Sequence, residues 1–109
     1  MTAPDKPIEL RPVVLWFAQQ MELKLRENDH KGGWHKHDPR DLAHRVIEEA
    51  DKLLEDAEVA VIADDESLSN VNDHYRAAIA EAANIANMAM MVADHFRDGG
   101  PSEDQGRTL

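Results

Sequence analysis

Residues 75–95 constrain the fold of this 109-residue chain more than any other stretch. They are rich in alanine and contain neither glycine nor proline, a composition that predicts one long helix. Glu81 and Asn84 lie three residues apart within it and therefore share one side of the helix. Met88 and Met91 continue the same side, so we expect that side to pack inward. An acid and an amide there need partners, because burying them unpaired is costly.

Glu81 and Asn84 could have either of two kinds of partner. The first is a hydrogen-bonding neighbour in the core, with the acid satisfied by a lysine or an arginine, and spacing alone favours it. The second is a metal ion that acids from another helix help to hold. Hard cations such as Mg²⁺ prefer carboxylate and amide oxygens, and they retain water molecules that substrate phosphates can replace.

Acids that could help to hold such a metal ion lie on a helix predicted over residues 39–62. Asp38 is suited to cap its start, and Pro39 to be its first residue. Glu49 lies within the inward stripe, where surface acids do not normally occur, whereas Glu48 and Asp51 stand on an adjoining side. The apolar members expected in this stripe are Leu42, Val46, Leu53 and Ala57, with Ala50 and Leu54 beside them.

A first helix is predicted from Pro12 to about residue 28, because proline suits the first helical turn. Trp16 and Leu15 widen its apolar side, which points to a contact with a second subunit. The buried stripe itself recurs at spacings of three and four, and its expected members are Val14, Phe17, Met21 and Leu25.

Residues 29–37, DHKGGWHKH, separate these two helices. Gly32 and Gly33 permit backbone conformations closed to other residues, and Lys31 and Trp34 flank them. Such a loop is either a plain turn, which spacing alone favours, or a segment that presents backbone amides and an aromatic ring to a nucleotide. A second connection is predicted at residues 64–73, with a short helical piece at 66–70, before the last helix runs to about residue 97.

Composition predicts a single all-α domain with its core at about residues 10–98 and flexible tails at 1–9 and 99–109. The chain has no cysteine, which excludes disulfides and zinc–thiolate sites. Its 22 acidic and 12 basic residues argue against nucleic-acid binding, and a phosphorylated ligand would need divalent cations for much of its positive charge. The sequence has neither a signal region nor an apolar run of about 18 residues. We therefore expect a soluble, cytoplasmic protein that does not bind membranes.

Three segments carry a resemblance to a known family. Glu48 and Glu49 begin the motif EEADK on the second helix, and Glu81 and Asn84 bound the motif EAAN within EAANIANMAMMVAD on the third. The segment MELKLRENDHKGGW precedes both. Over residues 15–96 the chain resembles the MazG-like all-α nucleoside triphosphate pyrophosphohydrolases, in particular the short phage-type forms that act on dATP and dGTP.

The resemblance implies an oligomeric helical bundle, dimeric or tetrameric, in which residues 1–109 form one MazG-like domain. It implies hydrolysis of a nucleoside triphosphate, with dGTP or dATP favoured, to the monophosphate and pyrophosphate. It further implies Mg²⁺, or Mn²⁺ in its place, held by Glu48, Glu49, Glu81 and Asn84, with Glu48 and Glu49 catalytic. Contacts with the phosphates, base and sugar are expected from Lys24, Asn28, Lys31, Trp34, Lys52 and Asn87.

The chain departs from the family pattern, Glu-Glu-x-x-Glu followed by Glu-x-x-Asp, at two positions. Lys52 stands where the third glutamate is expected, and Asn84 stands where the aspartate is expected. The alternative is therefore a non-catalytic acidic helical module with a degenerate metal site, which binds a nucleotide or a protein. An ion pair from Lys52 to Glu49 or Glu81 that fills the pocket favours this alternative, and an open pocket favours an active site.

Overall fold

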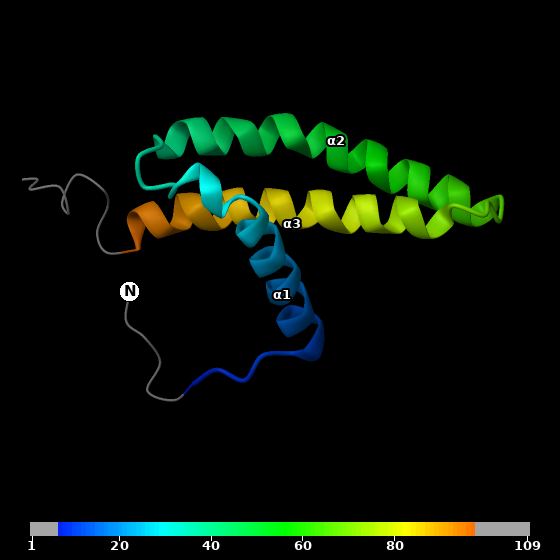
Figure 1. The fold of residues 1–109 in the computed structure, drawn as a ribbon, viewed down its shortest axis with the longest axis horizontal. Coiled ribbons are helices and arrows are strands. Elements are labelled where there is room, and N and C mark those ends of the chain that lie inside the picture. The colour runs from blue at the N-terminus through cyan, green and yellow to red at the C-terminus, as the bar shows by residue number, and fades with distance from the viewer. Residues whose placement is uncertain (1–6, 98–109) are drawn as a thin grey trace, which may run out of the picture.

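The computed structural model describes residues 7–97, and within them it contains three α-helices, one short 3-10 helix and no strand. The helices are α1 (Pro12–Glu27), α2 (Pro39–Asp65) and α3 (Val71–Phe96), with the short helix η1 (Asp29–Lys31) after α1. α2 and α3 form a long antiparallel hairpin, and α1 crosses α3 at a steep angle (Figure 1). The predicted all-α class is confirmed, whereas the predicted tails lie largely outside the described residues.

Local signals set the start of α2. The Asp38 side chain accepts a hydrogen bond from the backbone N–H of Arg40 at 2.8 Å, so it caps the helix as predicted. The Arg40 guanidinium also donates hydrogen bonds to this carboxylate and lowers the pKa of Asp38 to about 2. Pro39 follows as the first helical residue.

The end of α2 differs from the prediction. The helix continues to Asp65, and the short helix predicted at residues 66–70 is absent, so α3 begins earlier than expected. Ser67 adopts a left-handed conformation with φ 53°, and the N–H of Leu68 donates to the carbonyl of Ala63 at 3.0 Å. This backbone pattern closes α2 and turns the chain directly into α3.

The interface between α2 and α3 follows an alternating spacing of three and four residues, which is typical of nearly antiparallel helix pairs. On α2 the buried or half-buried residues are Pro39, Leu42, Val46, Glu49, Leu53, Asp56, Ala60 and Ala63. On α3 the same spacing runs through the buried or half-buried residues Val71, His74, Ala78, Glu81, Ile85, Met88, Val92 and His95. The predicted positions Ala50, Leu54 and Ala57 are instead exposed, because a repeat of 3.5 residues carries the stripe through Asp56 and Ala60.

The core is thin, because no large side chain in residues 7–97 is fully buried. α1 covers α3 mainly with its C-terminal half, where Phe17, Met21 and Leu25 are half-buried as predicted. Val14, which was expected in the same stripe, is 45 % exposed because the N-terminal half of α1 projects away from α3 (Figure 1). No helix in residues 7–97 has the length and apolar character needed to cross a membrane.

The loop between α1 and α2 is fixed to the end of α3. The indole Nε1 of Trp34 donates a 3.0 Å hydrogen bond to Asp94 Oδ2, and His35 Nε2 lies 3.0 Å from the same oxygen. His95 Nε2 donates to the carbonyl of Trp34 at 3.2 Å. The hydrogen bond from Trp34 lowers the pKa of Asp94. The loop is therefore held by side chains about sixty residues away in sequence.

Removal of the Leu42 side chain tests the position of the α2–α3 interface. Leu42 is 3 % exposed, so Leu42→Ala is expected to lower the free energy of unfolding by about 2–4 kcal/mol in urea denaturation. Leu54 lies on the same helix but is 60 % exposed, and Leu54→Ala is expected to change the same quantity by less than about 0.5 kcal/mol. Equal losses in the two variants would contradict the interface described above.

Acid is expected to release the loop that carries Trp34. Because the pKa of Asp94 is lowered from 3.8, its stabilising contribution is present above pH 3.8 and is lost as the pH falls through the lower value. Trp34 fluorescence, recorded in a Trp16→Phe variant, should change in this range. Asp94→Asn keeps the shape of the side chain but cannot titrate there, so an identical acid transition in that variant would show that Asp94 is not responsible.

Candidate functional site

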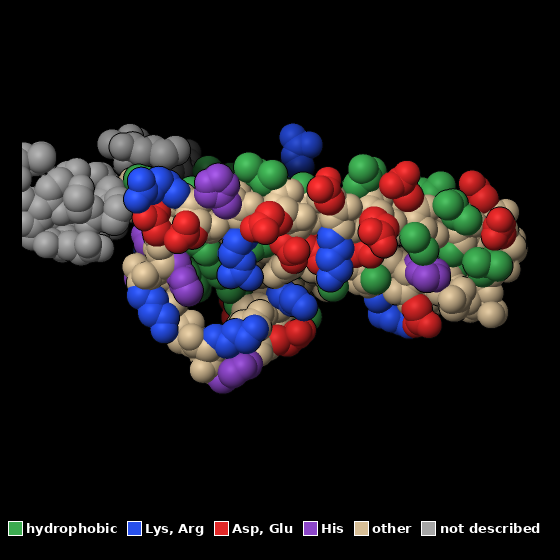
Figure 2. Space-filling view, turned by 90° about the horizontal axis from the view of Figure 1, so that it is seen from above, with side chains coloured by type: hydrophobic (Ala, Val, Ile, Leu, Met, Phe, Trp, Pro, Cys, Tyr) green, Lys and Arg blue, Asp and Glu red, His purple; other side chains and the backbone are tan. Residues whose placement is uncertain are grey.

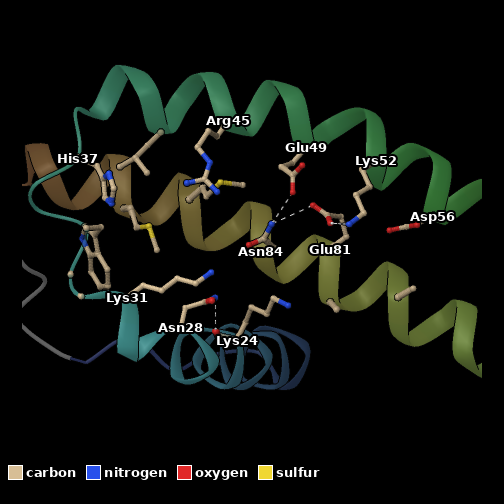
Figure 3. Close-up of a pocket in the computed structure, with 18 residues that line it drawn as sticks. Lys24, Asn28, Lys31, His37, Arg45, Glu49, Lys52, Asp56, Glu81 and Asn84 are labelled. Atoms are coloured by element: carbon tan, nitrogen blue, oxygen red, sulfur yellow. Dashed lines mark hydrogen bonds and ion pairs between the residues drawn. The ribbon is translucent and has the colours of Figure 1, made fainter.

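A cavity of about 560 Å³ lies between α2, α3, the end of α1 and the following loop (Figure 3). Its floor includes apolar side chains of both hairpin helices, such as Leu42 and Met88. Most of the site residues named from the sequence line it, although they come from four separate segments of the chain. These lining residues are Lys24, Asn28, Lys31, Trp34, Glu49, Lys52, Glu81 and Asn84.

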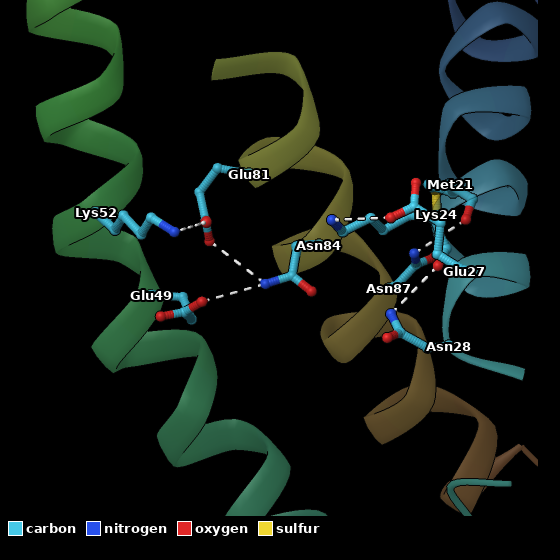
Figure 4. A network of polar contacts seen from close by, with 9 residues as sticks. All are labelled: Met21, Lys24, Glu27, Asn28, Glu49, Lys52, Glu81, Asn84 and Asn87. Carbon is cyan, nitrogen blue, oxygen red and sulfur yellow. Dashed lines mark hydrogen bonds and ion pairs between the residues drawn. The ribbon is translucent and has the colours of Figure 1, made fainter. Parts of the chain in front are cut away.

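The polar centre of the cavity joins α2 to α3. The amide Nδ2 of Asn84 lies 3.2 Å from Glu49 Oε1 and 3.5 Å from Glu81 Oε2, so it donates to both carboxylates (Figure 4). Glu81 is only 6 % exposed and Glu49 is half-buried. Glu49 of α2 therefore lies next to Glu81 and Asn84 of α3, as expected from its place in the inward stripe.

Lys52 forms the second cross-link of the hairpin. Its Nζ lies 3.3 Å from Glu81 Oε1, and this contact raises the pKa of the Lys52 ammonium. Both oxygens of the buried Glu81 carboxylate therefore have a donor. The ion pair that favours the non-catalytic alternative is present beside the polar centre, and it leaves a cavity of about 560 Å³.

Two of the residues named from the sequence lie elsewhere. Glu48 is exposed and does not line the cavity. Asn87 is 3 % exposed, and its Nδ2 donates to the carbonyl of Met21 at 3.0 Å, which ties α3 to α1. The buried Oδ1 of Asn87 has no hydrogen-bond partner within residues 7–97. Asn87 thus holds two helices together beside the cavity.

The oxygen donors at the polar centre of the cavity are the carboxylates of Glu49 and Glu81. No group of three or more His, Asp or Glu side chains within the described residues is placed to hold a metal. Mg²⁺, however, is commonly held by one or two carboxylates together with water and substrate phosphates. The carboxylates of Glu49 and Glu81 provide such a set, whereas the Asn84 amide turns its N–H groups rather than its carbonyl oxygen toward them, and protonated Lys52 does not ligate.

Sequence reasoning missed Arg45, which lines the cavity from α2. It precedes Glu49 by four residues and therefore lies on the same side of the helix, a spacing that could have identified it. Asp56 and His37 also line the cavity, at opposite ends (Figure 3).

Neither a protein-family model nor a curated protein nor a solved structure matches this chain. The resemblance described above therefore rests on the quoted motifs alone.

Proposed function

We propose that the cavity binds a nucleoside triphosphate with one Mg²⁺ ion and hydrolyses it to the monophosphate and pyrophosphate. One observation carries this proposal: the oxygen donors of α2 and α3 share a single cavity with lysines and an aromatic ring from α1 and its loop. A phosphorylated ligand with a planar base requires these three kinds of group together. The motif resemblance favours a purine deoxynucleotide.

In the proposed reaction a water oxygen bonds to the α-phosphorus. The bond from that phosphorus to the oxygen bridging the α- and β-phosphates breaks, pyrophosphate leaves with the bridging oxygen, and the attacking water gives up a proton. Mg²⁺ held by Glu49 and Glu81, and by Asn84 once its amide has turned its carbonyl oxygen toward the ion, would neutralise phosphate charge and lower the pKa of a water molecule.

Glu49 is the residue best placed to orient the attacking water and take its proton. Its Oε1 accepts the hydrogen bond of Asn84, and its Oε2 has no partner within residues 7–97. Lys24 and Lys31 supply positive charge for the phosphate oxygens, and the ring of Trp34 offers a surface for the base. Asn28 donates its Nδ2 to the carbonyl of Lys24 at 3.3 Å, which leaves its carbonyl oxygen for the ligand.

A second candidate function is nucleotide binding without hydrolysis. The ion pair of Lys52 with Glu81 favours it, because an ammonium group occupies one carboxylate oxygen that a metal would need. The two functions share the cavity and differ only in turnover.

We also propose that the chain assembles into a homodimer or homotetramer. Its α1 leaves several large apolar side chains exposed, with Val13, Leu15 and Trp16 exposed by 64 %, 50 % and 43 %. Apolar side chains are also scattered among the acids over the α2 side of the molecule (Figure 2). An assembly that covers these side chains would remove their apolar surface from water, which favours association.

Hydrolysis is tested by incubating the protein with each common NTP and dNTP and Mg²⁺ or Mn²⁺, and by measuring monophosphate and pyrophosphate. Glu49→Gln and Glu81→Gln are each expected to lower the rate by about 100-fold or more, because both remove a charged oxygen donor. Glu58→Gln changes an exposed acid of α2 outside the cavity and should keep the rate. Unaltered rates in both cavity variants would refute the site, and no turnover by wild type would leave the second candidate function.

Assembly is tested by light scattering coupled to size-exclusion chromatography. The wild type is expected to show at least twice the mass of one chain. Leu15→Lys places a charge on the exposed apolar side of α1 and should shift the protein toward the single-chain mass. Leu68→Lys, an exposed position in the α2–α3 connection, is the matched control and should not. A single-chain mass for the wild type would contradict the proposal.

A further inference from the structure

Basic side chains outnumber acidic ones around the cavity, whereas acids outnumber bases in the chain as a whole. Within residues 7–97, four basic side chains but only three acidic ones line the cavity, although the sequence has 22 acids and 12 bases. In the space-filling view, basic side chains surround the hollow between the helices and the loop, and acids are frequent over the rest of that face (Figure 2). The four basic residues are Lys24, Lys31, Arg45 and Lys52, and the three acids are Glu49, Asp56 and Glu81.

Two of these cations have no acidic partner. Lys24 pairs with Glu27 at 3.5 Å and Lys52 pairs with Glu81 at 3.3 Å. Within residues 7–97 neither Lys31 nor Arg45 forms an ion pair, although the chain has ten more acids than bases. Two unpaired cations beside one cavity repel each other, and an anion between them relieves that repulsion.

The unpaired cations lie at one end of the cavity. Arg45, Glu49, Lys52 and Asp56 follow one another along one side of α2, so Arg45 and Asp56 are about 16 Å apart along the helix axis. Arg45 extends from α2 and Lys31 extends from the opposite wall, both toward the space near the loop (Figure 3). The acids that would repel an anion are thus concentrated toward the centre and the far end.

We propose that Lys31 and Arg45 form an anion subsite that binds the phosphate chain of the ligand directly, without a metal ion. The inference rests on the proposed function, since it assigns the phosphate end of the same ligand. The planar guanidinium of Arg45 can donate two parallel hydrogen bonds to one phosphate group, and Lys31 adds a point charge from the facing loop. This subsite adds Arg45 to the lysines expected to contact the phosphates, and it supplies part of the positive charge that the acidic composition led us to expect mainly from divalent cations.

The test is calorimetric titration of the intact protein with inorganic triphosphate in excess EDTA. The wild type is expected to bind, and Arg45→Gln and Lys31→Gln should each weaken binding about tenfold. Arg45→Lys keeps the charge and should bind more tightly than Arg45→Gln. Lys36→Gln removes a charge from the same loop outside the cavity and should change the affinity by less than about twofold.

A variant of the metal-ligand candidates separates this subsite from the proposed reaction. Glu49→Gln removes a negative charge from the cavity, so it should strengthen triphosphate binding in EDTA by about twofold while it abolishes Mg²⁺-dependent hydrolysis. Triphosphate binding without any hydrolysis would refute the reaction and keep the subsite. Absence of triphosphate binding in EDTA, or wild-type affinity in both Arg45→Gln and Lys31→Gln, would overturn the subsite whatever the hydrolysis assay gives. Far-ultraviolet circular dichroism of each variant establishes that the helices are intact.

Discussion

The polar cross-link in the middle of the α2–α3 hairpin is the interaction on which the rest of the structure depends. Glu81 is nearly buried, and both of its oxygens receive donors, one from Asn84 and one from Lys52. Polar contacts within an apolar helix interface penalise other alignments of the two helices, because a shifted register would leave a buried carboxylate without its partners. The same contacts place Glu49 and Asn84 at the centre of the cavity, so the alignment of the hairpin and the geometry of the site have one origin.

The two departures from the family-like motif form one local arrangement. With glutamate and aspartate at positions 52 and 84, the cross-link would contain four carboxylates within a narrow space. With Lys52 and Asn84 it contains two carboxylates, one ammonium and one amide, and every pair in contact is attractive. Lys52 and Asn84 therefore replace the repulsion that carboxylates at these two positions would cause with attractive contacts to Glu49 and Glu81. The hairpin does not need a bound cation to hold its two acids close together.

Local signals predicted more of this fold than of its site. Proline at positions 12 and 39 and the cap at Asp38 gave the helix starts, since each acts through its own backbone. The stripe of α2 was misplaced at Leu54 and Ala57, because only the partner helix decides between periods of 3.5 and 3.6 residues. Glu49 was identified because an acid in an apolar stripe is unusual, whereas Arg45 was missed because an exposed cation breaks no pattern. The inward contact of Asn87 with α1 depends on a helix crossing that no local sequence pattern encodes.

The hydrogen bond between Trp34 and Asp94 has a consequence for the order in which the molecule assembles. It joins residues sixty positions apart, with the whole of α2 and nearly all of α3 between them. A contact of such long sequence separation requires the intervening chain to be ordered, which costs conformational entropy. The wall of the cavity that carries the loop closes only when α2 and α3 have paired and brought residues 34 and 94 together, so a chain without this contact lacks that wall. Any molecule that binds there selects the fully folded chain and shifts the equilibrium of folding as a whole.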